Sequence, residues 1–459
     1  MKMKTWYELS SINLMLRMLQ MKRAEHLDQF HLHALQQQRF KKLLKYVVAH
    51  SEFYRDYYRE HGIRLDQLDQ VRLEDLPIID KKIVMEHFDQ LVCDRNLKKA
   101  DLERFLSDPE MIDKKYMDRY EVTHTSGSSG RIGIFVHGPK DWTMLKALSF
   151  TRISQARILR FRKTRYAFIG VIDGHYAGIS ISRSGPKSVV NFLPLDINWP
   201  MTKISTELNS FQPDVLSGYS SGVYQLALEQ QKGRLQIKPE KIICSADPLT
   251  EQMAEVIHQA FGIKPSNCYA ATEAIGMAAE CDNHHGLHLF NDWHIFEVIN
   301  PYGNPVEPGE PGTLVVTNLL NYTQPLIRYR MDDSVVLAEN GCSCGWSFPR
   351  LKTIEGRNEE YLRFEWPDGH FQLLHPIVFV EFFVAGLEKL QIVQVARNQL
   401  KLNVILAGDE QAILARIRAK MDQVLQSNQL ADFVRYEINP VQEIPNDQKT
   451  GKFKLIIPV

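Results

Sequence analysis

The sequence predicts an α/β protein, with a large N-terminal domain of parallel-rich sheets and helices and a small α+β C-terminal domain. Between Glu121 and Asn318, short apolar runs alternate with helical patterns, which is typical of parallel strands joined by helices. After Arg357 the pattern changes to alternating strands around one helix stripe. A chain of 459 residues is also too long for a single compact core.

The first hundred or so residues are helical in pattern, and we assign residues 1–120 to the helical part of the large domain. The opening stretch "MKMKTWYELSSINLMLRMLQMKR" predicts an amphipathic helix whose apolar side packs on the protein or on a partner. It lacks the small-residue cleavage site of a secretory signal. The residues near its apolar face are Trp6, Leu9, Ile12, Leu16 and Leu19. A second helical stretch, "HLHALQQQRFKKLLKYVVAHSEFYRDYYREHG", ends at Gly62.

Three apolar runs indicate strands of the central domain, which we place at residues 121–355: "YAFIGVI", "DVLSGY" and "EKIICSA". The segment "SSGVYQLALEQQ" between the last two predicts a helix. Each run ends in small or polar residues. Because ligands of parallel sheets bind beyond the carboxyl ends of the strands, a site is expected there. The Pro- and Gly-rich stretch "NPYGNPVEPGEPGTLVVT" then indicates turns and antiparallel strands.

Residues 356–459 form the predicted C-terminal domain, with a hinge near residues 357–360. The stretch "LKLNVIL" alternates apolar and polar side chains, and "FVRYEI" is a second strand. Between them, "EQAILARIRAKMDQVLQ" places apolar residues along one helix stripe.

Composition excludes several classes of protein. Lys plus Arg and Asp plus Glu both total 55, so no basic surface for nucleic acid is expected. No apolar run reaches the roughly 18 residues of a transmembrane helix. Six cysteines in a chain of this length do not form a disulfide framework, which predicts a cytoplasmic protein. The oligomeric state is not evident from the sequence, and a homodimer stays open.

The stretch "THTSGSSGRIGIFVHGP" contains six consecutive residues that are all hydroxyl-bearing or glycine: Thr125, Ser126, Gly127, Ser128, Ser129 and Gly130. Arg131 follows, so the lysine of a P-loop is missing. A mobile turn and a phosphate-binding loop both fit this composition. Strand-like flanks favour the phosphate loop, because glycines expose backbone N–H groups to an anion.

Four further motifs follow in order: "YAATEAIG", "IRYRMDD", "EGRNEE" and "TGKFK". This series resembles the adenylate-forming superfamily of acyl-CoA synthetases. It is most similar to the phenylacetate–CoA ligase branch, with its capsule-locus and coenzyme-adenylylating members. The resemblance runs almost the whole length and includes "SADPLT" and "HGLHLFNDWHIFEVINPYGNPVEPGEPGTLVVTNL".

The resemblance implies a role for each matching residue. The loop from Thr125 to Gly130 would hold the β- and γ-phosphates of ATP. The adenine would lie near Ala246 and Asp247 and against Tyr269, and Asp333 would accept both ribose hydroxyls beside Arg357. Thr272 would contact the α-phosphate and Glu273 would help to hold Mg²⁺. Lys452, on a mobile terminal domain, would reach the α-phosphate and the attacking carboxylate. Taken singly, Glu273, Asp333 and Lys452 also fit a helix N-terminal acid, an exposed turn and a solvated lysine.

The implied reaction is the ATP-dependent activation of a carboxylic acid, expected to be aryl or otherwise apolar, as acyl-AMP. Transfer of the acyl group to a thiol of CoA or of carrier-protein phosphopantetheine would follow. A second hypothesis is an adenylyltransferase that moves AMP onto a hydroxyl of a coenzyme or metabolite. A third is a scaffold that retains only the fold, against which the intact Thr272, Glu273, Asp333 and Lys452 argue.

Cysteine and histidine residues suggest a second site. Many members of the branch carry a structural zinc, and the matching residues here are Cys281, His288, Cys342 and Cys344. A closed Cys₃His set leaves no position for a reactive water. His284 and His285 are rivals of His288, and a C-x-C pair alone also fits two surface thiols. His175, after a predicted strand, matches an aromatic gate on the acyl pocket, and a hydrogen-bonded structural histidine is the alternative.

The sequence departs from the family beyond the hinge. The stretch "YLRFEWPDGHFQLLHPIVF" lacks most of the glycine-rich loop that CoA-using relatives carry. The acceptor therefore stays open among CoA, a carrier protein, an amine and a hydroxyl. The hinge acid is Glu359 or Glu360 in place of the usual aspartate.

Overall fold

The computed structural model describes residues 2–125, 132–155, 162–354, 362–366, 371–374, 377–380, 382, 384, 386–445 and 455–457. The chain packs into two units. Unit 1 comprises Met1–His124, Ile134–Pro194 and Phe211–Arg357, and unit 2 comprises Thr125–Gly133, Leu195–Ser210 and Asn358–Val459. The two units are described separately below.

Unit 1 begins with helices whose ends are set by polar side chains. Asp28 caps α2, because its carboxylate accepts a 2.9 Å hydrogen bond from the His31 N–H. Ser51 ends α2 and caps α3, where its hydroxyl accepts from the Tyr54 N–H at 3.3 Å. The second predicted helical stretch is therefore two helices. The N-terminal elements are α1 (Lys2–Ala24), α2 (Gln29–His50), α3 (Glu52–Glu60), η1 (Leu65–Gln67), η2 (Leu73–Asp75), α4 (Lys81–Glu86), α5 (Phe88–Leu91), α6 (Lys99–Ser107) and η3 (Pro109–Met111).

The α1 helix packs through a different face from the predicted one. Leu14, Met18 and Met21 are buried against α7 (Pro139–Leu148) and the π-helix η4 (Ser149–Ile153). Leu16 and Leu19, which belong to the predicted apolar face, are 57% and 48% exposed. The helix thus carries two apolar stripes on opposite faces, and sequence periodicity alone does not say which one the chain covers.

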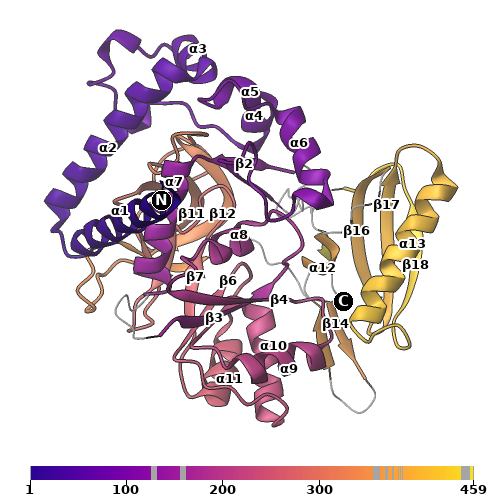
Figure 1. The fold of residues 1–459 in the computed structure, drawn as a ribbon. Helices are drawn as coiled ribbons and strands as arrows, with labels where there is room; N and C mark the ends of the chain where they lie inside the picture. Colours follow the sequence, from indigo (N-terminus) through magenta and orange to yellow (C-terminus); the bar gives the residue numbers. More distant parts are fainter. Residues whose placement is uncertain are drawn as a thin grey trace. The chain divides into compact units, whose positions relative to one another are not determined.

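An 11-stranded sheet forms the centre of the fold, in the order β10-β11-β12-β13-β9-β8-β7-β6-β5-β3-β4. Neighbouring strands β3, β5, β6 and β7 are parallel, which confirms the predicted α/β class. Helices α10 and α11 pack side by side next to these strands (Figure 1). The elements are β3 (Thr164–Gly170), α8 (Ala177–Arg183), β4 (Val190–Asp196), β5 (Val215–Tyr219), α10 (Ser220–Gln231), β6 (Lys241–Ser245), α11 (Glu251–Phe261) and β7 (Ser266–Tyr269). Between β4 and β5 in the sequence, α9 (Met201–Phe211) belongs to unit 2 except for its last residue.

The other half of the sheet is antiparallel, as the Pro- and Gly-rich stretch predicts. The strand β10 pairs with β11 from His294↔Asn318 to Ile299↔Thr313. Apolar side chains of this half, including Leu314, Val316 and Tyr329, share one core with Phe40 and Leu44 of α2. The strands are β8 (Ala278–Glu280), β9 (Leu287–Leu289), β10 (His294–Ile299), β11 (Pro311–Asn318), β12 (Tyr329–Leu337) and β13 (Arg350–Ile354). A separate hairpin pairs β1 (Glu121–His124) with β2 (Ile134–His137).

A buried charge network joins α1 to the sheet. The guanidinium of Arg152 in η4 donates to both carboxylate oxygens of Asp292, at 2.7 and 2.9 Å. The same group donates to the Met21 carbonyl of α1 at 3.0 Å and lies 3.7 Å from Glu25. Removing either partner would leave a buried charge unpaired, which is strongly destabilising. The bond from Arg152 to the Met21 carbonyl therefore stabilises the packing of the C-terminal half of α1.

Unit 2 contains an α+β domain. Its four-stranded sheet has the order β18-β17-β16-β19, and α13 covers it with Ile413, Ile417 and Met421 (Figure 1). The predicted strands and helix of this region are all present. The elements are β14 (Leu362–Glu365), β15 (Phe371–Leu374), α12 (Ile377–Val380), β16 (Leu387–Ala396), β17 (Gln399–Leu406), α13 (Glu410–Ser427), β18 (Arg435–Pro440) and β19 (Ile456–Ile457).

Within the described ranges, the longest helices are too polar to cross a membrane.

Candidate active site

The carboxyl ends of the parallel strands place several predicted site residues at one edge of unit 1. Ala246 and Asp247 directly follow β6, Tyr269 ends β7, and Thr272 and Glu273 lie in the next loop. Because β5, β6 and β7 are parallel neighbours, these ends lie side by side. This is the edge at which open α/β sheets bind their ligands.

Tyr269 and Asp333 meet at this edge from distant parts of the sheet. The Tyr269 hydroxyl donates a 2.6 Å hydrogen bond to Oδ2 of Asp333. Asp333, in β12, is only 6% exposed. The structure therefore brings together the residue predicted to lie against adenine and the residue predicted to accept the ribose hydroxyls.

The turn after β6 has a strained backbone. Ala246 has a φ of +71°, and the Asp247 N–H donates to the Ser245 carbonyl at 2.9 Å across it. This is a γ-turn with a positive central φ, a rare and strained conformation for a residue with a Cβ. The turn leaves Ala246 exposed. A ligand at the sheet edge can thus reach its backbone.

Asp247 stabilises this turn through hydrogen bonds to the first residues of α10. Its carboxylate accepts from the N–H groups of Ser220 and Ser221, the second at 3.0 Å, and its carbonyl accepts from the Ser220 hydroxyl at 2.8 Å. These amides are the first of α10, so the carboxylate also complements the positive end of that helix. Asp247 is buried and acts on the turn, while Ala246 faces outward. The sequence did not indicate this pairing with α10.

The loop that carries Thr272 and Glu273 is closed by its own backbone. Ala271 and Ala274 exchange N–H to C=O hydrogen bonds of 3.4 and 3.1 Å, and the Met277 N–H donates to the Tyr269 carbonyl at 3.1 Å. Gly276 has a φ of +72°, and a Cβ there would lie 2.8 Å from Leu148 of α7. The loop therefore rests on α7 through a position that only glycine fits. Within it, Glu273 is buried and Thr272 half-buried.

Only part of the predicted phosphate loop is described. The hydroxyl of Thr125 accepts a 2.8 Å hydrogen bond from the Gly133 N–H, and the Thr125 N–H donates to the Gly133 carbonyl at 2.9 Å. Thr125 thus closes the base of the loop. Ser126, Gly127, Ser128, Ser129 and Gly130 lie outside the described residues, as do Arg357, the hinge acids Glu359 and Glu360, and Lys452.

His175 follows β3 and is buried, with its ring centroid 4.9 Å from that of Phe105. Burial lowers the pKa of its imidazole to about 4, so the ring is neutral at pH 7. Its Nε2 has no hydrogen-bond partner among the described residues. The two rings are tilted by 46° to one another, and both are buried.

The predicted metal ligands converge. The ligand atoms of Cys281, His288, Cys342 and Cys344 all lie within 4.8 Å of one another. The sulfurs of Cys281 and Cys342 are 3.8 Å apart, and Cys344 Sγ is 3.5 Å from His288 Nε2. Ligands about 2.3 Å from a tetrahedral Zn²⁺ are themselves roughly 3.8 Å apart, so the set fits zinc. His284 instead pairs with Glu280 at 3.1 Å.

Strand pairing positions this cluster. Cys281 follows β8 and His288 lies in β9, which pairs with both β8 and β13. Nδ1 of His288 lies 3.3 Å from the Phe348 carbonyl, which leaves Nε2 for the metal. The loop that carries Cys342 and Cys344 also holds the connection between α1 and α2: His26 Nδ1 lies 2.9 Å from the Gly345 carbonyl, and the Ser347 N–H donates to the Glu25 carbonyl at 3.0 Å.

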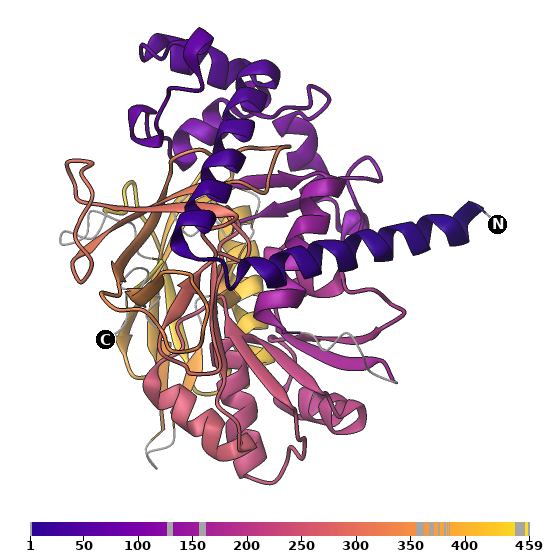
Figure 2. The same ribbon diagram turned by 90° about the vertical axis from the view of Figure 1, so that its left-hand side faces the viewer.

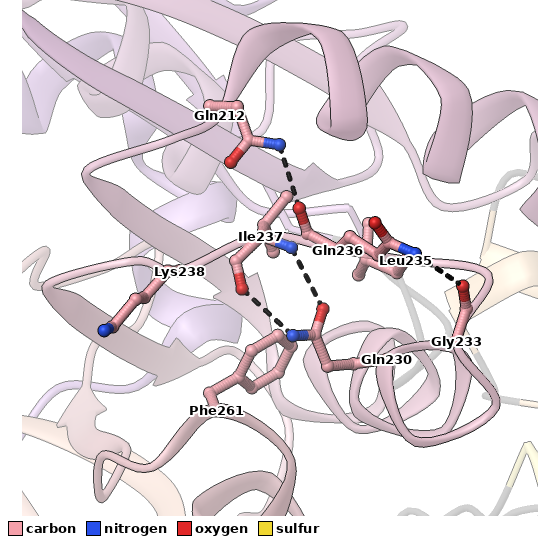
Figure 3. A pocket seen from close by; sticks show the side chains of 8 residues that line it. All are labelled: Gln212, Gln230, Gly233, Leu235, Gln236, Ile237, Lys238 and Phe261. Carbon is pink, nitrogen blue, oxygen red and sulfur yellow. Dashed lines mark hydrogen bonds between the residues drawn. The ribbon is translucent and has the colours of Figure 1, made fainter.

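A hollow elsewhere on unit 1 is distinct from this edge. It is lined by residues that precede β5 and β6, such as Gln212 and Lys238, and by Phe261 at the end of α11 (Figure 3). It therefore lies at the amino ends of the parallel strands. The Gln230 amide exchanges hydrogen bonds with the Ile237 backbone, at 3.0 and 3.1 Å. These hydrogen bonds stabilise the loop between α10 and β6. None of the predicted site residues lines the hollow.

A solved structure has a fold similar to that of this chain. The structure of 2-hydroxyisobutyryl-CoA ligase in the postadenylation state, in complex with R3-HIB-AMP, superposes with a TM-score of 0.61 at 20% identity, over 95% of this chain and 92% of that one. This match establishes the fold. Together with the sequence relatives, it makes the chain similar to adenylate-forming, acyl-CoA synthetase-like enzymes.

The relatives place the chain beside a particular branch. It is 28% identical over 354 residues to the phenylacetate-coenzyme A ligase of Thermus thermophilus, covering 74% of this chain and 73% of the relative. It is 25% identical over 354 residues to the protein CapK of Staphylococcus aureus, covering 72% and 68%. No family model matches the sequence.

Proposed function

We propose that the protein activates a carboxylic acid with ATP and transfers the acyl group to the thiol of coenzyme A. The observation that carries this proposal is the meeting of Tyr269 and Asp333 beside the Ala246 turn and the Glu273 loop. These residues offer an aromatic face, a buried carboxylate and exposed backbone, which suit a nucleoside. The ligase relatives support coenzyme A as the acceptor over transfer of AMP to a hydroxyl.

In the first step, a carboxylate oxygen of the acid attacks the α-phosphorus of ATP, and the bond to pyrophosphate breaks. Two anions approach one another, so the barrier is mostly charge repulsion and positioning. Thr272 and Lys452 would donate to the α-phosphate, and Arg357 would bind near the ribose. Glu273 would hold Mg²⁺, which would neutralise phosphate charge when bound. The loop of residues 125–130 holds the β- and γ-phosphates.

In the second step, the thiol sulfur attacks the acyl carbon, the bond to AMP breaks and a thioester forms. The domain at residues 356–459 rotates about the hinge between the two steps, which removes Lys452 and opens a path for the thiol. We place the acyl group near His175, whose buried ring lies 4.9 Å from that of Phe105, and we expect an aryl or otherwise apolar acid. Carrier-protein phosphopantetheine is the alternative thiol.

Zinc is the proposed occupant of the Cys281, His288, Cys342 and Cys344 cluster. Four protein ligands complete a tetrahedron, so the metal would have a structural role. It would fix β8 and β9 relative to the loop before β13.

The test is acid-dependent exchange of pyrophosphate into ATP, run with a panel of aryl and aliphatic acids. We expect exchange with a subset of apolar acids, and the acyl-CoA product, identified by mass, when CoA is added. Exchange that requires no acid, together with a stable AMP-modified hydroxyl compound, would replace this proposal with the adenylyltransferase.

A further inference from the structure

We propose that Arg328 is a positioning residue, which holds the register of β12 so that Asp333 lies beside Tyr269. Its importance for activity rests on the proposed function, in which Asp333 accepts the ribose hydroxyls of ATP. Arg328 directly precedes β12 and is only 7% exposed. It would act through the strand and not by touching the nucleotide.

The pairing of β12 with β11 is interrupted at Asp333. Thr313 of β11 pairs with Ser334, whereas Val315 pairs with Arg330. Three residues of β12, including Asp333, therefore lie opposite one residue of β11. A bulge of this kind re-aims the side chains that it contains. The carboxylate predicted to bind ribose thus depends on where the bulge is placed along the strand.

The apolar pattern of β12 does not select this register. The two halves of the ladder are offset by two residues, and side chains alternate between the faces of a strand with a period of two. A continuous ladder without the bulge would therefore keep the core residues Tyr329, Met331 and Val335 on their present face. It would shift one half of β12 by about 7 Å along β11 and take Asp333 out of the bulge. A contact other than core packing has to exclude it.

Arg328 supplies such a contact, because it ties the start of β12 to three neighbouring segments. Its guanidinium donates two hydrogen bonds to the Glu297 carboxylate of β10, at 2.8 and 3.1 Å. It also donates to the carbonyls of Glu74 and Leu76, at 3.0 and 2.6 Å. The Arg328 N–H donates to the Thr317 hydroxyl of β11 at 2.9 Å. Because β11 lies between β10 and β12, the ion pair with Glu297 spans that strand.

The backbone around Arg328 is held as well. Its φ of +50° is uncommon for a residue with a Cβ. The Ile79 N–H donates to the Arg328 carbonyl at 3.0 Å, and the Arg330 N–H donates to the Ile79 carbonyl at 2.8 Å. Ile79 lies between α3 and α4 in the sequence, and in Figure 2 the purple helices of this region lie above the orange antiparallel strands. A slip of this half of β12 by two residues would break all of these bonds.

The first test is a double-mutant cycle on stability, which needs no nucleotide. Arg328→Met combined with Glu297→Met replaces the buried ion pair by apolar side chains, a change that proteins often tolerate. Tyr269→Phe removes a donor to Asp333 and should lower the melting temperature of the wild-type protein. In the Arg328→Met, Glu297→Met background it should lower it no further, because Asp333 has lost its place. Sites that do not influence one another give additive shifts, and additive shifts would overturn the proposal.

The second test compares the binding of ATP and 2′,3′-dideoxy-ATP. The wild-type protein should prefer ATP by roughly ten-fold or more. The Arg328→Met, Glu297→Met variant should bind both with similar affinity, as Asp333→Asn should. If both nucleotides bind more weakly and the preference is kept, the role of Arg328 is general stability and the proposal is overturned. A non-additive cycle in a protein whose wild type has no preference would support the positioning of Asp333 and overturn only its contact with ribose.

Two further variants complete the experiment. Arg328→Lys keeps the charge beside Glu297 but loses the planar fork, so both readouts should lie between those of the wild type and the double variant. It also replaces the double variant if that protein does not fold. Arg234→Met with Glu229→Met removes another bidentate pair of unit 1, with bonds of 2.5 and 2.6 Å, and should change neither readout. Effects of equal size in this control would overturn a specific role of Arg328.

Discussion

The phenol of Tyr269 donates a 2.6 Å hydrogen bond to the carboxylate of Asp333, although β7 and β12 are separated in the sheet by β8, β9 and β13. The contact joins the end of β7, in the parallel half of the sheet, to the middle of β12, in the antiparallel half. It also fixes the orientation of a carboxylate that is almost fully buried. In the proposed enzyme, the ribose site is thereby formed before ATP arrives.

Replacing the Asp333 carboxylate should weaken ATP binding more than it slows the formation of acyl-AMP. Asp333→Asn should raise the KM for ATP by roughly ten-fold or more, because a hydrogen bond to a charged group contributes about 1.5–3 kcal/mol. Tyr269→Phe should raise it less. Steady-state pyrophosphate exchange measures both. Tyr436→Phe is the matched control, because Tyr436 donates a 2.6 Å hydrogen bond to the exposed Asp422 of α13. Equal effects of Tyr269→Phe and Tyr436→Phe would contradict a specific role.

The turn after β6 gives a test based on stability. Asp247→Ala leaves the buried N–H groups of Ser220 and Ser221 without their acceptor, so it should lower the free energy of unfolding by about 2 kcal/mol. Ala246→Gly relieves the positive φ and should leave that free energy unchanged or raise it by up to about 1 kcal/mol. Urea unfolding of the two neighbouring variants measures the contrast. A destabilised Ala246→Gly would show that the turn is unstrained.

Much of the fold could be predicted from local patterns. The strands at β3, β5 and β6 are short apolar runs that end in small or polar residues, and α10 has the bounds of its predicted segment. Local periodicity also identified β17, α13 and β18. The alternation of these elements was enough to predict a parallel sheet and therefore the edge at which ligands bind.

Contacts between distant residues could not be predicted in the same way. Asp247 was placed near a nucleotide, but its carboxylate caps α10, whose first residues lie 27 and 26 positions earlier. Arg152 carried no motif, yet it pairs with Asp292 across 140 residues. The apolar face of α1 was assigned from a spacing that two faces share. Tertiary packing decided each of these cases.

From the cluster of three cysteines and His288, we predict that the purified protein contains bound zinc. Mass spectrometry of the native protein should show one zinc per chain, and Cys342→Ser and Cys344→Ser should both lose it and lower the melting temperature. Cys93→Ser is the control, because Cys93 is not one of the four converging residues. Wild-type protein that contains no metal, with all four side chains open to chemical modification, would contradict the zinc assignment.

Buried histidines predict instability in acid. Burial lowers the pKa of His137, His175 and His294 to about 4, below the usual value of 6.5. Between these values the unfolded chain binds more protons than the folded chain, so stability falls as the pH drops from about 6.5 to 4. His137 is 1% exposed and neither ring nitrogen has a described hydrogen-bond partner. His137→Phe should therefore reduce the slope of unfolding free energy against pH by up to one proton, and urea unfolding measured between pH 4 and 7 gives this slope. An unchanged slope would contradict the role of His137.

Replacing Lys452 tests whether the C-terminal domain takes part in adenylation. Lys452→Ala should reduce the rate of acyl-AMP formation by at least a hundred-fold while changing ATP binding little, because a cation placed at the α-phosphate stabilises charge that develops only in the transition state. Single-turnover measurement of acyl-AMP, followed by mass, gives this rate directly. Lys454→Ala is the matched control within "TGKFK" and should retain activity.

If purified acyl-AMP is supplied, the Lys452→Ala variant should form thioester at the wild-type rate, because the role of Lys452 ends before the thiol attacks. Equal loss of both half-reactions would instead assign Lys452 to folding or to a general binding role.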